Sequence, residues 1–261
     1  EPQPRQRRFI SKTIDEYFHL LDDTAHAVTK CADAKLGFGV HSLRAVKPED
    51  VIRTVEQGPK EIPFHLHAAE QLKEVEDSVA FLKKRPIEWL LENISLNDRF
   101  HMVHCTHMND NEVAGLAKSK AHAVLCPGTE GNLGDGIFRL TDYHRHGGSW
   151  SIGTDSHISL NPLEDLRWLD YAQRFTTHKR NTFDDGATIL IYTTLLAGRR
   201  AMGNPTQAYF EEGQPLDAVI YNANAPLLEQ AGFDHALPAI IYTADTSAIL
   251  GTMVNGKWIV Q

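Results

Sequence analysis

Cysteine is scarce in this sequence, long apolar runs are missing, and positive charge is not in excess. The three cysteines among 261 residues are irregularly spaced, so reduced thiols rather than a disulfide framework are expected. No run of about 18 apolar residues is present to span a bilayer, and the first eight residues lack the apolar core of a signal peptide, which predicts a cytoplasmic protein without membrane contact. The 34 acidic and 26 basic residues give a net charge of −8, which argues against nucleic-acid binding, because such binding needs cations along the phosphates.

What the sequence does have is a globular composition and many histidines. Apolar residues make up 42% and charged residues 23%, which is enough to bury a core. There are 14 histidines, and the imidazole is the commonest metal ligand and a proton carrier near neutral pH. The positions of the histidines therefore guide the functional interpretation.

The apolar pattern predicts alternating strands and helices, that is, an α/β fold. Short runs rich in β-branched and aromatic residues predict five strands, at residues 37–40, 63–67, 100–104, 121–126 and 150–155. Amphipathic segments predict helices at residues 11–30, 48–57, 86–91, 164–169 and 187–202, and one more ending near Leu116 after a cap at Asn109 or Asn111. In the first helix, His19 and His26 are expected to face solvent.

The pattern changes towards the end of the chain. From Gly213 onward we expect short alternating strands with turns, and Asn255-Gly256 is a strong hairpin signal between two of them. This predicts a division into residues 1–205, a catalytic β/α domain, and residues 206–261, a helix end followed by part of a small β-sandwich.

Polar residues follow four of the five predicted strands. In a parallel sheet or barrel, the loops after the strands open on one face, and functional sites assemble there. A single histidine at a strand end is usually structural, but the joint pattern favours a site. The candidates are His41 and Arg44, His67 and Glu70, His104, and Asp155.

The segment from His67 to Glu70 is the most informative one. The strand brings an imidazole to the rim, and the turn returns a carboxylate three residues later, an arrangement typical of a metal ligand next to a proton carrier. His65 points to the same strand face and is interpreted first as a packed interior residue and second as a ligand. His107 is expected in a loop beside His104.

Other polar residues are weaker candidates. His144 and His146 stand two apart in a segment predicted to be helical, where they point in different directions, so we interpret them as surface residues. Glu130, Asn132 and Asp135 follow Cys126 in a glycine-rich loop and either line a pocket or make turns; both interpretations stay open.

With these residues in view, the sequence resembles the amidohydrolase superfamily, and within it the formimidoylglutamate deiminase family of histidine degradation. The matching segments occur in order along the chain. They are HSLRAV at 41–46, HLHAAEQ at 65–71, VHCTH at 103–107, CPGTEGNLGDG at 126–136 and GTDSH at 153–157.

The resemblance implies a zinc hydrolase on a (β/α)8 barrel that converts N-formimino-L-glutamate and water into N-formyl-L-glutamate and ammonia. It implies that His67 and Asp155 bind the metal, that Glu70, His104 and Asp155 are catalytic, and that His41 and Arg44 bind a small substrate carrying a carboxylate. It also implies a homodimer. The planar guanidinium of Arg44 suits a carboxylate.

One feature of the family has no counterpart in this sequence. The family carries a His-x-His pair after its first barrel strand, and none lies upstream of His41, so the five strands correspond to strands four to eight. We therefore expect an incomplete barrel with unpaired sheet edges and an apolar patch. Catalytic zinc usually has three protein ligands, and His65 or His104 could join His67 and Asp155.

Two alternatives remain open from the sequence. The first is another amidohydrolase, such as an imidazolonepropionase-like enzyme or an aromatic-base deaminase; a base deaminase would have no substrate carboxylate for Arg44 to bind. The second is a non-catalytic fragment that keeps the binding residues without turnover. Release of ammonia with added zinc distinguishes the second alternative from an active enzyme.

Overall fold

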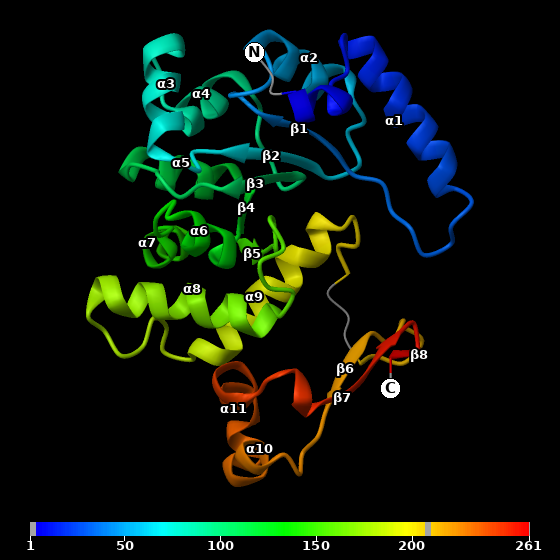
Figure 1. Ribbon diagram of the computed structural model, residues 1–261, viewed down its shortest axis with the longest axis vertical. Helices are drawn as coiled ribbons and strands as arrows, with labels where there is room; N and C mark the ends of the chain where they lie inside the picture. Colours follow the sequence, from blue (N-terminus) through cyan, green and yellow to red (C-terminus); the bar gives the residue numbers. More distant parts are fainter. Residues whose placement is uncertain (1–3, 207–209, 261) are drawn as a thin grey trace.

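A computed structural model describes residues 4–206 and 210–260. At its centre lies a sheet of five parallel strands, each paired with the next one in the sequence (Figure 1). The strands are β1 (Phe38–Ser42), β2 (Phe64–Ala68), β3 (Phe100–His104), β4 (His122–Leu125) and β5 (Trp150–Ile152). All five predicted strands are confirmed; β1 ends two residues later than expected, and β5 ends three residues earlier.

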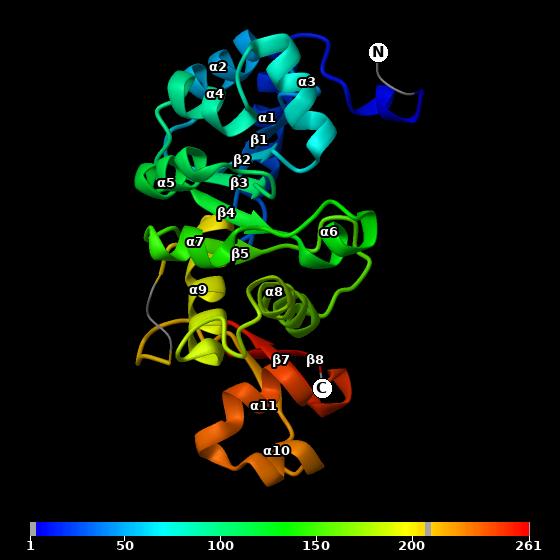
Figure 2. The same ribbon diagram turned by 90° about the vertical axis from the view of Figure 1, so that its left-hand side faces the viewer.

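Helices lie between successive strands of the sheet. They are α2 (Pro48–Gln57), α3 (Leu72–Leu82), α4 (Pro86–Asn93), α5 (Asp110–Ser119), α6 (Pro127–Leu133) and α7 (Leu140–Arg145). Figure 2 shows α4, α5 and α7 following one another along one side of the sheet. Val51 of α2 and Leu90 of α4 lie with Phe64, Leu66 and Phe100 in the apolar layer between the sheet and these helices. This layer forms because alternate strand residues are large and apolar.

The predicted helices are confirmed, and their ends agree within three residues, except that the helix predicted at 164–169 extends to Thr177. The remaining long helices are α1 (Ile14–Val28), α8 (Pro162–Thr177) and α9 (Gly186–Ala201), and a short 3₁₀ turn, η1 (Pro4–Phe9), precedes α1. Asn109 is the cap of α5, because its side chain accepts a hydrogen bond from the Glu112 N–H at 2.9 Å. His19 and His26 are exposed, as expected.

The free edge of β1 is partly covered by α1. The hydroxyl of Tyr17 donates to the carbonyl of Gly39 at 2.7 Å and accepts from its N–H at 3.1 Å, so the side chain occupies hydrogen-bonding positions at the sheet edge. Gly39 is required on steric grounds, since a Cβ there would lie 2.0 Å from the His65 carbonyl oxygen. The edge of β1 is thus less open than the sequence suggests.

Three histidines stack on the face of the sheet opposite to the apolar layer under α2 and α4, near the amino ends of the strands. The rings of His65 and His101 are 4.9 Å apart, and those of His101 and His122 are also 4.9 Å apart. His65 Nε2 lies 3.0 Å from the carbonyl oxygen of Ala201 at the end of α9. This row lies at the end of the sheet away from the predicted site, and it agrees with His65 as a packed interior residue.

The C-terminal segment is less purely β than predicted. A three-stranded antiparallel sheet of β6 (Ala218–Tyr221), β7 (Ile249–Val254) and β8 (Lys257–Val260) is present. However, residues between its strands form α10 (Pro226–Ala231), η2 (Phe233–His235), α11 (Ala236–Thr243) and η3 (Thr246–Ala248). The expectation of strands throughout was wrong, because Pro226 begins a helix at its first position and the apolar α11 packs against α8 and α9.

The predicted hairpin turn is confirmed. Asn255 and Gly256 have φ angles of 49° and 73° between β7 and β8, the backbone that such a two-residue turn requires. The division of the chain at residue 205 stays a prediction, and residues 1–3, 207–209 and 261 lie outside the described part. Within that part, no helix is long and apolar enough to cross a membrane.

Candidate active site

All residues proposed for the site lie at or just after the carboxyl ends of the strands. Because the five strands are parallel, these ends meet at one edge of the sheet. β1 places His41 and Arg44, β2 places His67 and Glu70, β3 ends at His104, and the turn after β5 holds Asp155.

His104 is the centre of this cluster, and only 1% of it is exposed. Its Nε2 atom lies 3.8 Å from Oε1 of Glu70 and 3.8 Å from Oδ2 of Asp155, while its Nδ1 atom lies 3.3 Å from Oε1 of Glu130. Burial disfavours the charged ring, but the hydrogen bond with Glu130 and the charges of the three carboxylates outweigh it, so the pKa of His104 is raised. The imidazole and two acids can therefore exchange protons at one place.

The turns that carry the site residues have left-handed backbone. The φ angles are 52° at Ala69, 71° at His104 and 42° at Asp155. For residues other than glycine this conformation costs about 1 kcal/mol or more and persists only where the surroundings fix it. At Ala69 they do, because the Glu74 carboxylate accepts hydrogen bonds from the N–H groups of Ala69 and Glu70 at 3.0 and 2.8 Å.

His67 and His41 lie side by side at the ends of neighbouring strands. Nδ1 of His67 is 2.8 Å from the carbonyl oxygen of His41, so Nδ1 carries the proton and Nε2 is left as the basic nitrogen. The two rings are 4.9 Å apart, and the rings of His67 and His104 are 5.6 Å apart. Burial, followed by the charges of His67 and Arg44, lowers the pKa of His41.

Arg44 contacts carboxylates of the protein itself. Its guanidinium makes an ion pair and hydrogen bond with Glu70, and its Nε atom lies 3.7 Å from Oε2 of Glu74. The Arg44 side chain is 30% exposed, so a substrate carboxylate could reach its guanidinium. The same guanidinium lies directly beside Glu70, the proposed catalytic acid.

The chemistry of the donors fits a zinc ion in part. His67 offers Nε2 with Nδ1 held by a carbonyl, the usual arrangement behind a metal ligand, and Asp155 offers a carboxylate. Within residues 4–206 and 210–260, His104, Cys126 and Glu130 form a group of three potential ligands whose atoms lie within 4.8 Å of one another. This group contains neither His67 nor Asp155. If both bound the ion, His67 and Asp155 would account for two of the three protein ligands that catalytic zinc usually has.

Two residues of α6 reach the site, and the sequence left this segment open. Glu130 is 4% exposed and contacts His104, whereas Thr129 bonds to the turn around Asp155 through Thr154 and Ser156. The expected glycine-rich loop is helical up to Leu133. Pro127 at the first helical position was the signal for this helix.

The neighbouring polar residues have structural contacts. Asp135 is buried and accepts from the Gln71 side chain at 2.9 Å, while His107 lies in the loop after β3 with Nε2 2.6 Å from the Asp135 carbonyl oxygen. Asn132 is exposed. Of these open candidates, only Glu130 contacts a predicted catalytic residue.

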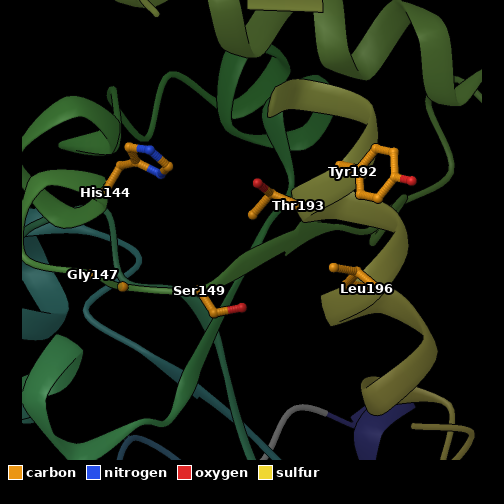
Figure 3. A pocket seen from close by; sticks show the side chains of 7 residues that line it. His144, Gly147, Ser149, Tyr192, Thr193 and Leu196 are labelled. Carbon is orange, nitrogen blue, oxygen red and sulfur yellow. The ribbon is translucent and has the colours of Figure 1, made fainter. Parts of the chain in front are cut away.

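A separate cavity of about 240 Å³ lies away from these residues. Figure 3 shows His144 and Ser149 on one side of it and Tyr192, Thr193 and Leu196 of α9 on the other. His144 is half-buried and packs against Phe183 at 4.7 Å, and His146 is exposed. None of the proposed site residues lines this cavity.

The chain belongs to the amidohydrolase family, because the sequence pattern of that family matches residues 12–259. Its five parallel strands with their helices are therefore part of a (β/α)8 barrel, accompanied by a small antiparallel sheet.

Within the family, the chain is similar to the formimidoylglutamate deiminase of Pseudomonas aeruginosa, with 40% identity over 98% of this chain and 57% of that protein. A crystal structure of an amidohydrolase from Brucella melitensis superposes with a TM-score of 0.88 at 34% identity, over 100% of this chain and 58% of that one. An adenosine deaminase from Xanthomonas campestris with bound zinc shares the fold, with a TM-score of 0.81 at 24% identity over 94% and 56% of the two chains. The chain thus spans somewhat more than half the length of these relatives.

Proposed function

We propose that this protein is a zinc-dependent deiminase that hydrolyses N-formimino-L-glutamate to N-formyl-L-glutamate and ammonia. The observation that carries the proposal is the position of His104 Nε2, which lies 3.8 Å from both Glu70 and Asp155 at the strand ends. The similarity to a formimidoylglutamate deiminase supports this choice of substrate.

The reaction needs a nucleophile at the formimino carbon and protons for the departing nitrogen. Water adds to the carbon of the C=N bond, the nitrogen receives two protons, and the C–N bond breaks to release ammonia and leave the formyl group. Glu70 and Asp155 accept the protons of the water and pass them to the nitrogen. Nε2 of His104 can accept a hydrogen bond from the water and polarise it, and the raised pKa of His104 makes this nitrogen more basic.

His67 and Asp155 would hold the zinc ion, and they account for two of its ligands. When bound, zinc lowers the pKa of its water to about 7 and so supplies hydroxide at neutral pH. The carbonyl of His41 fixes the tautomer of His67 that leaves Nε2 available. The zinc-containing adenosine deaminase of the same fold supports the choice of metal.

Arg44 and His41 would bind the glutamate part of the substrate. A substrate carboxylate would take the guanidinium of Arg44 from Glu70, which would free the Glu70 carboxylate for proton transfer. Substrate binding and activation of the base are coupled in this arrangement.

The proposal is tested by measuring ammonia release from N-formimino-L-glutamate with zinc added and with zinc chelated. We expect turnover with zinc, loss of turnover with the chelator, and turnover at least about 100-fold slower for a formimino compound without carboxylates, since the Arg44 contact is then absent. Turnover of a nucleoside but not of formiminoglutamate would replace the proposal with a base deaminase. No turnover of either substrate would favour a non-catalytic fragment.

A further inference from the structure

Glu130 is a buried carboxylate that makes two hydrogen bonds through one oxygen. It is 4% exposed, and its Oε1 atom lies 3.0 Å from the backbone N–H of Cys126 and 3.3 Å from Nδ1 of His104. Because the Cys126 N–H can only donate, Oε1 is an acceptor. The Nδ1 atom of His104 must then carry the proton that it shares with Glu130.

The position of Glu130 is fixed by the helix that carries it. Helix α6 begins directly after β4, and the Glu130 N–H donates to the Cys126 carbonyl at 2.9 Å. The Gly128 N–H donates to the buried carboxylate of Asp165 in α8 at 3.1 Å, so the start of α6 is held from both sides. Glu130 therefore approaches His104 from a rigid element.

The opposite side of the His104 ring faces the reacting groups. With a proton on Nδ1 and the Glu130 carboxylate behind it, the ring cannot rotate about its Cβ–Cγ bond without losing that hydrogen bond, and Nε2 remains between Glu70 and Asp155. A buried carboxylate is costly unless donors meet it, so the ring and Glu130 stabilise each other.

We propose that Glu130 is the positioning residue of His104, which fixes the proton on Nδ1 and directs Nε2 towards the reacting groups. The inference rests on the proposed function for its catalytic meaning, but the contact itself can be tested without turnover.

The direct experiment is NMR of the protein labelled with ¹⁵N-histidine, with the His104 signals assigned through His104→Asn. In the wild type we expect His104 to carry its proton on Nδ1. In Glu130→Ala the proton should move to Nε2 in part of the molecules, and Glu130→Gln should keep the wild-type pattern, because the amide oxygen can still accept. Unchanged His104 signals in Glu130→Ala would overturn the proposal.

The matched control is Asp165→Asn. Asp165 is also a buried carboxylate that accepts from the backbone of α6, but it has no contact with His104. We expect the His104 signals of Asp165→Asn to match the wild type. A change as large as that in Glu130→Ala would mean that any loosening of α6 disturbs the ring, and would contradict a specific role of Glu130.

Kinetics complete the test. In Glu130→Ala we expect kcat for formiminoglutamate to fall about 10- to 100-fold with KM within a factor of about 2, and Glu130→Gln to recover most of kcat. If KM and kcat both fell in Glu130→Ala and in Glu130→Gln, and both variants also lost thermal stability, the result would contradict a role of Glu130 in positioning His104. If the wild type does not turn over formiminoglutamate, the proposed function fails, while the NMR result still decides the role of Glu130.

Discussion

The hydroxyl of Thr129 makes hydrogen bonds on both sides of Asp155. It donates to the Thr154 carbonyl at 3.3 Å, accepts from the Ser156 N–H at 3.1 Å, and lies 2.9 Å from the Ser156 hydroxyl. Asp155 itself has left-handed backbone, with φ of 42°. Thr129 thus holds the turn of one proposed catalytic residue, and the adjacent Glu130 contacts another, His104.

Removing the Thr129 hydroxyl should loosen the Asp155 turn. In Thr129→Val the Ser156 N–H loses its acceptor, which should cost about 1–3 kcal/mol of folding free energy, and ammonia release should slow about 10-fold or more. Thr129→Ser, which keeps the hydroxyl, should stay near the wild type in both urea unfolding and activity. Equal losses in the Ser and Val variants would show that the methyl packing matters rather than the hydrogen bonds.

Glu74 should be needed for the turn that carries Glu70. Its carboxylate accepts from two backbone N–H groups and is 3% exposed. Glu74→Ala leaves both donors buried without an acceptor, so we expect a loss of about 2 kcal/mol or more in urea unfolding. Glu76→Ala on the exposed side of the same helix is the control and should change stability by less than about 0.5 kcal/mol. A Glu74→Ala variant as stable as this control would disprove the role.

Tyr17 should stabilise the edge of β1. Tyr17→Phe removes the hydroxyl that makes two hydrogen bonds with Gly39, and we expect a loss of about 1 kcal/mol with more self-association, since the strand edge opens. Tyr192→Phe, at a side chain with 55% exposure, is the matched control. Urea unfolding and light scattering measure the two effects, and identical behaviour of the two variants would argue against edge protection.

The stacked histidines predict a loss of stability in mild acid. Burial and the charges of His122, His65 and Arg200 lower the pKa of His101 to about 2, and burial followed by the charge of Arg200 lowers that of His122. Both rings are thus neutral in the folded state but gain protons below pH about 6.5 when unfolded. Their contribution is complete above that pH and falls by about 1.4 kcal/mol per pH unit for each ring below it.

His101→Phe keeps a flat ring in the stack and removes one titrating group. Between pH 6.5 and 4.5, its unfolding free energy should therefore depend less steeply on pH than that of the wild type. The exposed His19 serves as the control, and His19→Gln should retain the wild-type slope. If the unfolding free energies of His101→Phe and the wild type depended equally on pH, His101 would not gain a proton on unfolding in this pH range.

Much of the fold was accessible from the sequence because it is encoded locally. The five strands are short β-branched and aromatic runs, and Asn255-Gly256 supplies the positive φ angles of its turn. The edge position of His104, Glu70 and Asp155 followed from the parallel order of the strands alone. The helices α10 and α11 were missed because a short apolar segment is equally compatible with a strand. Their helical form depends on tertiary packing, of α11 against α8 and α9 and of α10 against α11.

The supporting contacts of the site were not accessible in the same way. Glu130 and His104 are 26 residues apart, and nothing in the spacing shows that α6 turns back towards β3. The ion pair of Arg44 with Glu70 likewise depends on the turn that Glu74 holds. These contacts depend on tertiary distances, whereas the strand ends depend only on the local pattern.

Ammonia release from N-formimino-L-glutamate by the zinc-supplemented wild type and by Glu70→Gln tests the central claim most directly. The account predicts ammonia and N-formyl-L-glutamate in equal amounts from the wild type and a rate lower by about 100-fold or more in Glu70→Gln, because the amide cannot carry the proton. Equal rates for the two proteins would contradict the claim that Glu70, His104 and Asp155 act together as the catalytic groups.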